Sequence, residues 1–238
     1  MGKLSSSIVK TFLARVIKAG MVAILLPVAA GLLIGILGEL ERISLSGATF
    51  REWVTWGFVT YVTMHLLLYR PTPLFRASHR LFSVLAVWLF GGQVSSMQTA
   101  GAKGKAAKGK GEAVAQGSTL VAFSPYVIPL YTVLVCALGW VLQRGVLHTY
   151  VEGPVSFLIG TTLAFHWVMT ADDLQEQRSR WHVETYLLAL GLVFILTLLI
   201  GAACLPWAVA EFSFIDALAN GLSAAQEILT TLVQRLFL

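Results

Sequence analysis

The segment that decides the fold reads His79-Arg80-Leu81-Phe82-Ser83-Val84-Leu85-Ala86-Val87-Trp88-Leu89-Phe90-Gly91-Gly92. Its apolar part, residues 81–92, would extend about 18 Å as an α-helix at 1.5 Å per residue. The hydrocarbon core of a bilayer is about 30 Å thick, so this segment is too short to cross it. We therefore expect a short helix that begins at His79 and either re-enters the membrane or lies buried among longer helices.

The composition of the whole chain is typical of a helical membrane protein. Of its 238 residues 57% are apolar and only 12% are charged, and the mean hydropathy is +0.77. A soluble domain carries about 25% charged residues. Long charge-free runs recur, and about 20 helical residues suffice to cross a bilayer. The sequence therefore predicts an all-α polytopic membrane protein with about five full spans, at residues 19–37, 53–69, 124–142, 154–171 and 185–210.

Three regions are expected along the chain. Residues 1–18 mix lysine and arginine with apolar residues, which predicts a basic amphipathic helix on an anionic leaflet. Residues 19–210 form the transmembrane domain, and its polar loop, residues 93–123, alternates at both ends like a β-hairpin. The lysine-rich tip of that loop contains no aromatic residue to stack on bases, so we interpret it as a solvated flexible loop rather than a binding site. For the protein as a whole, membrane lipids are expected partners and nucleic acid is not. Residues 211–238 form a C-terminal amphipathic helix.

Two patterns indicate helix–helix contacts. Gly31 and Gly35 form a Gly-x-x-x-Gly pair, which can let another helix approach closely. The C-terminal helix carries a stripe in which apolar residues alternate at steps of three and four, as in a heptad repeat. We interpret this stripe as the candidate docking surface for another membrane protein subunit or transmembrane segment. Its members are Ile215, Leu218, Leu222, Ala225, Leu229, Leu232 and Leu236.

The distribution of basic residues predicts the orientation. If the segment at His79 does not cross, 13 of the 17 Lys and Arg residues lie on the side of the N-terminus. The other four are Arg42, Arg51, Arg144 and Arg235. If the segment does cross, nine basic residues lie on the side of the N-terminus and eight on the other side. The positive-inside rule therefore favours the arrangement in which the segment does not cross. The N-terminus and the hairpin should then be cytoplasmic.

Four segments together resemble the bacterial site-2-protease-like membrane zinc metallopeptidases. They are residues 59–70, which end His65-Leu66-Leu67-Leu68-Tyr69-Arg70, residues 79–92, Ser124-Pro125-Tyr126-Val127-Ile128-Pro129-Leu130-Tyr131, and Leu163-Ala164-Phe165-His166. The resemblance covers about residues 53–200 and includes the order of a short helix, a hairpin and a proline-bearing span. It implies a location in the bacterial inner membrane.

The catalytic motif of that family is degenerate in this chain. The family's short helix reads His-Glu-x-x-His, in which two histidines on one helix face bind zinc and the glutamate activates water. Here the first ligand is kept as His79, the base position holds Arg80, which cannot accept a proton, and the second ligand position holds Ser83. The resemblance therefore implies a pseudoprotease without zinc or other cofactor, acting as a binding or assembly subunit of a membrane complex.

A pseudoprotease still has to neutralise Arg80. An unpaired charge inside the membrane is costly. We therefore predict that Asp172 or Asp173 forms an ion pair with Arg80.

Three alternatives remain open from the sequence. The protein could be an active zinc peptidase with rearranged ligands His79, His166 and Asp172, since a site of histidines and a carboxylate is chemically sensible. It could be a small membrane transporter that uses polar residues within its spans, such as His65 and His166. It could also have inherited no site at all, with His79 and Arg80 merely capping a re-entrant helix.

Overall fold

The computed structural model describes most of the chain in two separate units. The described residues are 2–45, 48–67, 72–90, 93–96, 113–116, 125–144, 152–176 and 182–237. The first unit comprises Met1–Tyr69 and Pro129–Leu238, and the second comprises Arg70–Ile128.

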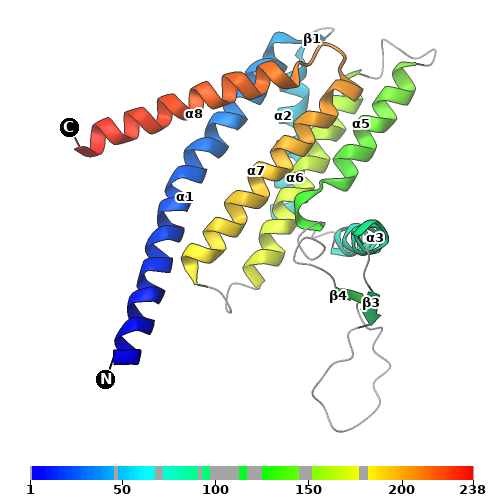
Figure 1. Ribbon diagram of the computed structural model, residues 1–238. Helices are drawn as coiled ribbons and strands as arrows, with labels where there is room; N and C mark the ends of the chain where they lie inside the picture. Colours follow the sequence, from blue (N-terminus) through cyan, green and yellow to red (C-terminus); the bar gives the residue numbers. More distant parts are fainter. Residues whose placement is uncertain are drawn as a thin grey trace. The chain divides into compact units, whose positions relative to one another are not determined.

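The first unit is a helical bundle (Figure 1). Its helices are α1 (Gly2–Arg42), α2 (Phe50–Leu67), α5 (Leu130–Gln143), α6 (Glu152–Glu176), α7 (Val183–Ala208) and α8 (Phe214–Phe237). Strand β1 (Ser44–Leu45) pairs antiparallel with β2 (Ala48–Thr49) where the chain passes from α1 to α2. Helix α2 packs on α6, α5 packs on α6 and α7, and α8 packs chiefly on α1.

Three of these helices are long and apolar enough to cross a membrane: Phe12–Arg42 within α1, α6 and α7. Five full spans were expected from the sequence. Helix α5 has only 14 residues, about 21 Å, and α2 carries Arg51 and Glu52 in its first turn. The structure thus gives a helical membrane protein with three candidate spans among its described residues.

Helix α1 joins two segments that were expected to be separate, the interfacial helix of residues 1–18 and the first span of residues 19–37. It runs from Gly2 to Arg42 without a break at residue 18, where we had placed the boundary between an interfacial helix and the first span. Residues 19–38 are free of polar and charged side chains and extend about 30 Å, the thickness of a bilayer core. Lys18 precedes this stretch and Glu39 follows it, so the two residues mark its ends.

The main hydrophobic core of the bundle is formed by buried residues of α1, α2, α5, α6 and α7. Cys136 is fully buried there and Cys204 is nearly so, and both thiols are free. The Thr132 hydroxyl donates a hydrogen bond to Thr162 Oγ1 at 3.2 Å, which joins α5 to α6. The Gln143 side-chain amide donates to the Ala208 carbonyl oxygen and joins α5 to the end of α7.

Glycines allow two helix pairs to approach until their backbones touch. A Cβ placed on Gly57 would lie 2.0 Å from the Phe157 carbonyl oxygen, and one on Gly160 would lie 2.0 Å from that of Val54. These positions join α2 to α6. The Gly31 and Gly35 pair predicted to receive another helix receives α8 of the same chain, at Ala217, Gly221 and Ala225.

The second unit contains α3 (Thr72–Phe90), β3 (Gln93–Ser96) and β4 (Ala113–Gln116). The expectation that the helix begins at His79 is wrong, because α3 begins at Thr72. Pro73 lies in its first turn, where the amide that proline lacks has no acceptor within the helix. The 19 residues of α3 extend about 28 Å, well beyond the 18 Å that the sequence analysis expected of its apolar part.

Strands β3 and β4 pair antiparallel, from Gln93 opposite Gln116 to Ser96 opposite Ala113. The alternating pattern at the far end of the loop, residues 118–123, had suggested that the second strand lies later in the chain than β4. Those residues and the lysine-rich tip, residues 101–111, lie outside the described part of the chain.

Candidate functional site

His79 is packed between aromatic rings on one face of α3. Its ring centroid lies 4.2 Å from that of Phe75, one turn earlier, and 4.8 Å from that of Tyr126, which it meets at 86°. Phe75 and Ser78 are buried on the same side of the helix, and the Ser78 hydroxyl donates a hydrogen bond to the Phe75 carbonyl oxygen at 2.8 Å. His79 therefore contributes to the packing of the second unit. The side chain of Ser83 lies outside the described residues.

Arg80 lies on a different face of α3 from His79 and is exposed. It shares that face with Arg76, and the two side chains border a surface hollow of about 470 Å³. The hollow is lined by Pro73, Arg76, Ala77, Arg80 and Leu81. Residues at these intervals follow one side of an α-helix.

A second polar site joins α2 to α6. His65 Nε2 lies 3.4 Å from an Asp172 carboxylate oxygen, and the His65 side chain is only 7% exposed against 34% for Asp172. The Tyr61 ring lies one turn earlier on α2, 5.9 Å from the His65 ring, and meets Phe165 of α6 edge-on at 5.7 Å. In the described part of the chain the buried atoms His65 Nδ1 and Tyr61 Oη have no hydrogen-bond partner.

This pair was not predicted from the sequence, which assigned Asp172 to Arg80 or to zinc. A histidine inside an apolar helix usually has a polar partner in the bundle interior, and that rule was the available signal. The choice of Asp172 depends on α2 and α6 running parallel, with Trp53 against Gly153 at one end and His65 against Asp172 at the other.

The remaining predicted residues are placed as follows. His166 is buried on α6. His79 and Arg80 belong to the second unit and Asp172 and Asp173 to the first, so the ion pair and the zinc set proposed from the sequence stay predictions. Among the described residues, no three histidine, cysteine or acidic side chains gather as metal ligands.

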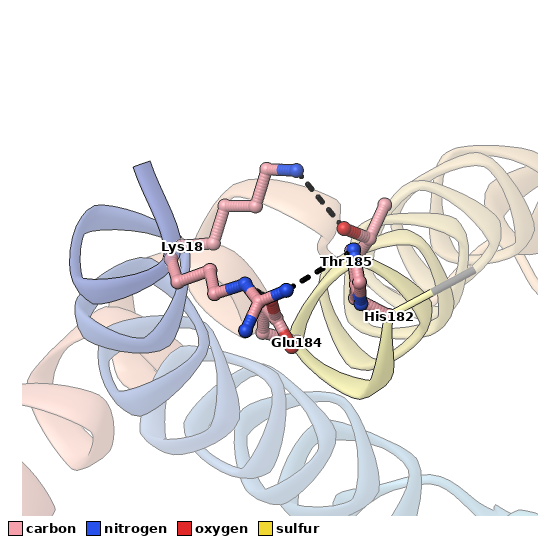
Figure 2. Close-up of polar contacts among 5 residues, drawn as sticks. Lys18, His182, Glu184 and Thr185 are labelled. Carbon is pink, nitrogen blue, oxygen red and sulfur yellow. Dashed lines mark hydrogen bonds and ion pairs between the residues drawn. The ribbon is translucent and has the colours of Figure 1, made fainter. Parts of the chain in front are cut away.

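A third polar cluster joins the basic part of α1 to the start of α7 (Figure 2). The Arg15 guanidinium lies 3.4 Å from the Glu184 carboxylate and 3.3 Å from His182 Nε2. Lys18 Nζ donates a hydrogen bond to the Thr185 hydroxyl at 2.9 Å. The sequence analysis assigned these cations to an anionic leaflet, whereas the structure shows that they also fix the first turn of α7 beside α1.

The candidate docking stripe on α8 is largely exposed. Ile215 and Leu236 are 76% and 74% exposed, and Leu222 and Leu232 are about half exposed. Leu218 and Leu229 are partly buried, while Ala225 is buried against α1. The contact with α1 is made by the small residues of α8, and most of the large apolar side chains remain uncovered.

The chain was compared with known proteins. No protein-family model, no curated protein and no solved structure matches it.

Proposed function

We propose that the protein is a five-span integral membrane subunit that binds or assembles other membrane proteins and has no peptidase activity of its own. The proposal includes the site-2-protease-like ancestry inferred from the sequence. It also includes a location in the bacterial inner membrane, with the N-terminus and the β3–β4 hairpin in the cytoplasm.

Helix packing supports α2 and α5 as the two further spans. Helix α2 runs parallel to α6 and contacts it from Trp53, near its start, to His65, near its end. A helix that follows a candidate span over this length occupies the same layer of the membrane. Helix α5 is likewise bonded to Thr162 of α6 near its start and to Ala208 of α7 at its end, so it lies alongside these two candidate spans.

The observation that carries the binding role is the arrangement of α8. Ala225 rests on Gly31, which precedes Glu39 by eight residues, or about 12 Å along α1. The middle of α8 therefore lies at the level of the apolar stretch of α1. Its exposed stripe is an uncovered apolar surface at that level, which fits an apolar helix of another membrane protein.

We expect that replacing Leu222, Leu232 and Leu236 together by serine releases this partner. Each side chain is 45% exposed or more, so the change removes apolar contact area without opening the core. The measurement is the mass of the complex extracted from its native membrane in mild detergent, determined by light scattering. The wild type should elute above the mass of one chain, and the variant should elute as a single chain.

A matched control tests polar residues of α8 that lie outside the stripe. Ser223, Gln226 and Thr230 are exposed and polar, and replacing them by alanine should leave the mass unchanged. A wild type that elutes as a single chain in lipid and detergent, or a leucine variant that keeps its mass, would contradict the docking role and leave the stripe facing lipid.

We also expect the purified protein to bind no stoichiometric zinc. Arg80 occupies the base position, and His79 is engaged between Phe75 and Tyr126. Elemental analysis after purification without chelators measures the metal content. One zinc per chain, lost in His79→Ala and kept in His182→Ala, would replace the proposal with an active peptidase.

A small membrane transporter is the second candidate function. The observation that favours it is the pair formed by the buried His65 side chain and the partly exposed Asp172, because ionisable residues inside a membrane protein commonly mark ion or substrate paths. Uptake in proteoliposomes that is lost in Asp172→Asn and kept in Asp173→Asn would favour this candidate.

A further inference from the structure

The second unit carries the whole net positive charge of the protein. Residues Arg70–Ile128 contain seven basic residues and one acidic residue, Glu112, which gives +6. The whole chain has a net charge of +5, so the first unit has a net charge of −1. The basic residues are Arg70, Arg76, Arg80, Lys103, Lys105, Lys108 and Lys110. Such an asymmetry indicates an anionic partner for the second unit.

Two of these cations are presented together by α3. Arg76 and Arg80 are four residues apart, so they lie on one face of the helix about 6 Å apart along its axis. Phe75 and Ser78, which lie on other sides of the helix, are buried, whereas both arginines are exposed. No acidic residue occurs in the described part of this unit, so the unit itself gives neither guanidinium a carboxylate partner there.

Apolar surface lies directly beside the two guanidinium groups. Leu81 lines the same hollow, and Leu74, Leu81 and Val84 are each more than half exposed. The ten residues of α3 after Arg80 carry no charge. A free phosphate would use only the guanidinium groups, whereas a lipid would also cover the leucine and valine side chains.

We propose that Arg76 and Arg80 bind the phosphate of an anionic phospholipid, whose acyl chain packs along Leu81 and Val84. Guanidinium groups match phosphate oxygens with paired hydrogen bonds. The site holds the start of α3 at the headgroup level and places its apolar end in the hydrocarbon. This inference is independent of the proposed binding role of α8.

The experiment counts lipids bound to the full-length protein by native mass spectrometry, using phosphatidylglycerol, phosphatidylcholine and inorganic phosphate as separate probes. We expect phosphatidylglycerol to bind about tenfold more tightly than phosphatidylcholine. Replacing both Arg76 and Arg80 by glutamine should remove this preference. The matched control replaces two arginines of the first unit, Arg144 and Arg235, by glutamine in the same way. This variant should keep the preference for phosphatidylglycerol.

A lysine variant keeps the test valid if the glutamine variant fails to fold. Changing Arg76 and Arg80 to lysine retains the charge but loses the paired hydrogen bonds, so the preference should fall partway. Equal binding of both lipids by the wild type, or loss of the preference in the Arg144 and Arg235 control, would overturn the proposal. Displacement of the lipid by excess inorganic phosphate would assign the site to a free phosphate instead and overturn the lipid assignment.

Discussion

Replacing Gly160 by alanine is expected to lower the stability of the protein by about 3 kcal/mol, because there is no space for one added methyl group. The new Cβ would lie 2.0 Å from the Val54 carbonyl oxygen and 2.8 Å from its carbonyl carbon. Both obstacles are backbone atoms of α2, so no side-chain rotation relieves the clash and α2 has to move away from α6. Unfolding by a denaturing detergent, followed by circular dichroism, measures the loss.

The control is Gly191→Ala on α7. Its added Cβ would meet only Leu25 Cβ at 3.9 Å, an ordinary contact, and alanine is up to about 1 kcal/mol more favourable than glycine in a helix. The two variants should therefore change stability in opposite directions. If Gly160→Ala is as stable as Gly191→Ala, then α2 and α6 are not in backbone contact.

The same substitution should affect the polar site between α2 and α6. His65 reaches Asp172 because Gly57 and Gly160 bring the two helices together, about two turns before His65 on α2 and about three turns before Asp172 on α6. A displaced α2 would separate the imidazole from the carboxylate. Gly160→Ala should then lose both stability and the His65–Asp172 contact. Asp172→Asn should lose the contact with His65 but keep its stability.

The sequence predicted the membrane class well because that property depends on local composition. Apolar runs without charge gave three of the helices their length and placed Cys136 and Cys204 in the core. Helix ends were predicted less well. The helix was expected to begin at His79, whereas α3 begins at Thr72 and contains Pro73, because proline is well tolerated in a first turn.

The candidate sites were predicted only in part because their partners are distant in the chain. The sequence singled out His65 and Asp172 separately, but no local pattern states that α2 runs parallel to α6. The resemblance drew attention to His79 and Arg80, and the structure shows the packing role of His79 against Phe75 and Tyr126. Long-range packing, rather than periodicity, decides which side chains meet.

In helix α8 the local sequence pattern likewise failed to identify the residues that make the contact. Its heptad-like stripe of large residues was interpreted as the contact surface, and the periodicity correctly marked the apolar side of the helix. The contact inside this chain is made instead by Ala217, Gly221 and Ala225, which repeat every four residues beside the large stripe. Small residues allow backbone contact, and a hydrophobicity pattern gives them little weight.

Replacing Gly35 by alanine is expected to detach α8 while the rest of the bundle stays folded. The new Cβ would lie 2.3 Å from the Ala217 carbonyl oxygen and 2.4 Å from the Gly221 amide nitrogen. Helix α8 packs chiefly on α1, so the clash has little effect on α5, α6 and α7. An overpacking cost of about 1–3 kcal/mol should speed hydrogen exchange of the α8 amides by about 5- to 150-fold.

Gly38→Ala is the matched control, because it lies on the same helix and its added Cβ has no atom within 4 Å. Its α8 amides should exchange at the wild-type rate, and the amides of α6 and α7 should be protected equally in both variants. Faster exchange in Gly38→Ala, or unchanged exchange in Gly35→Ala, would show that α8 is held by something other than the glycine contact. Since that contact also presents Leu222, Leu232 and Leu236 to the proposed partner, Gly35→Ala should release the partner without changing any residue of the docking stripe.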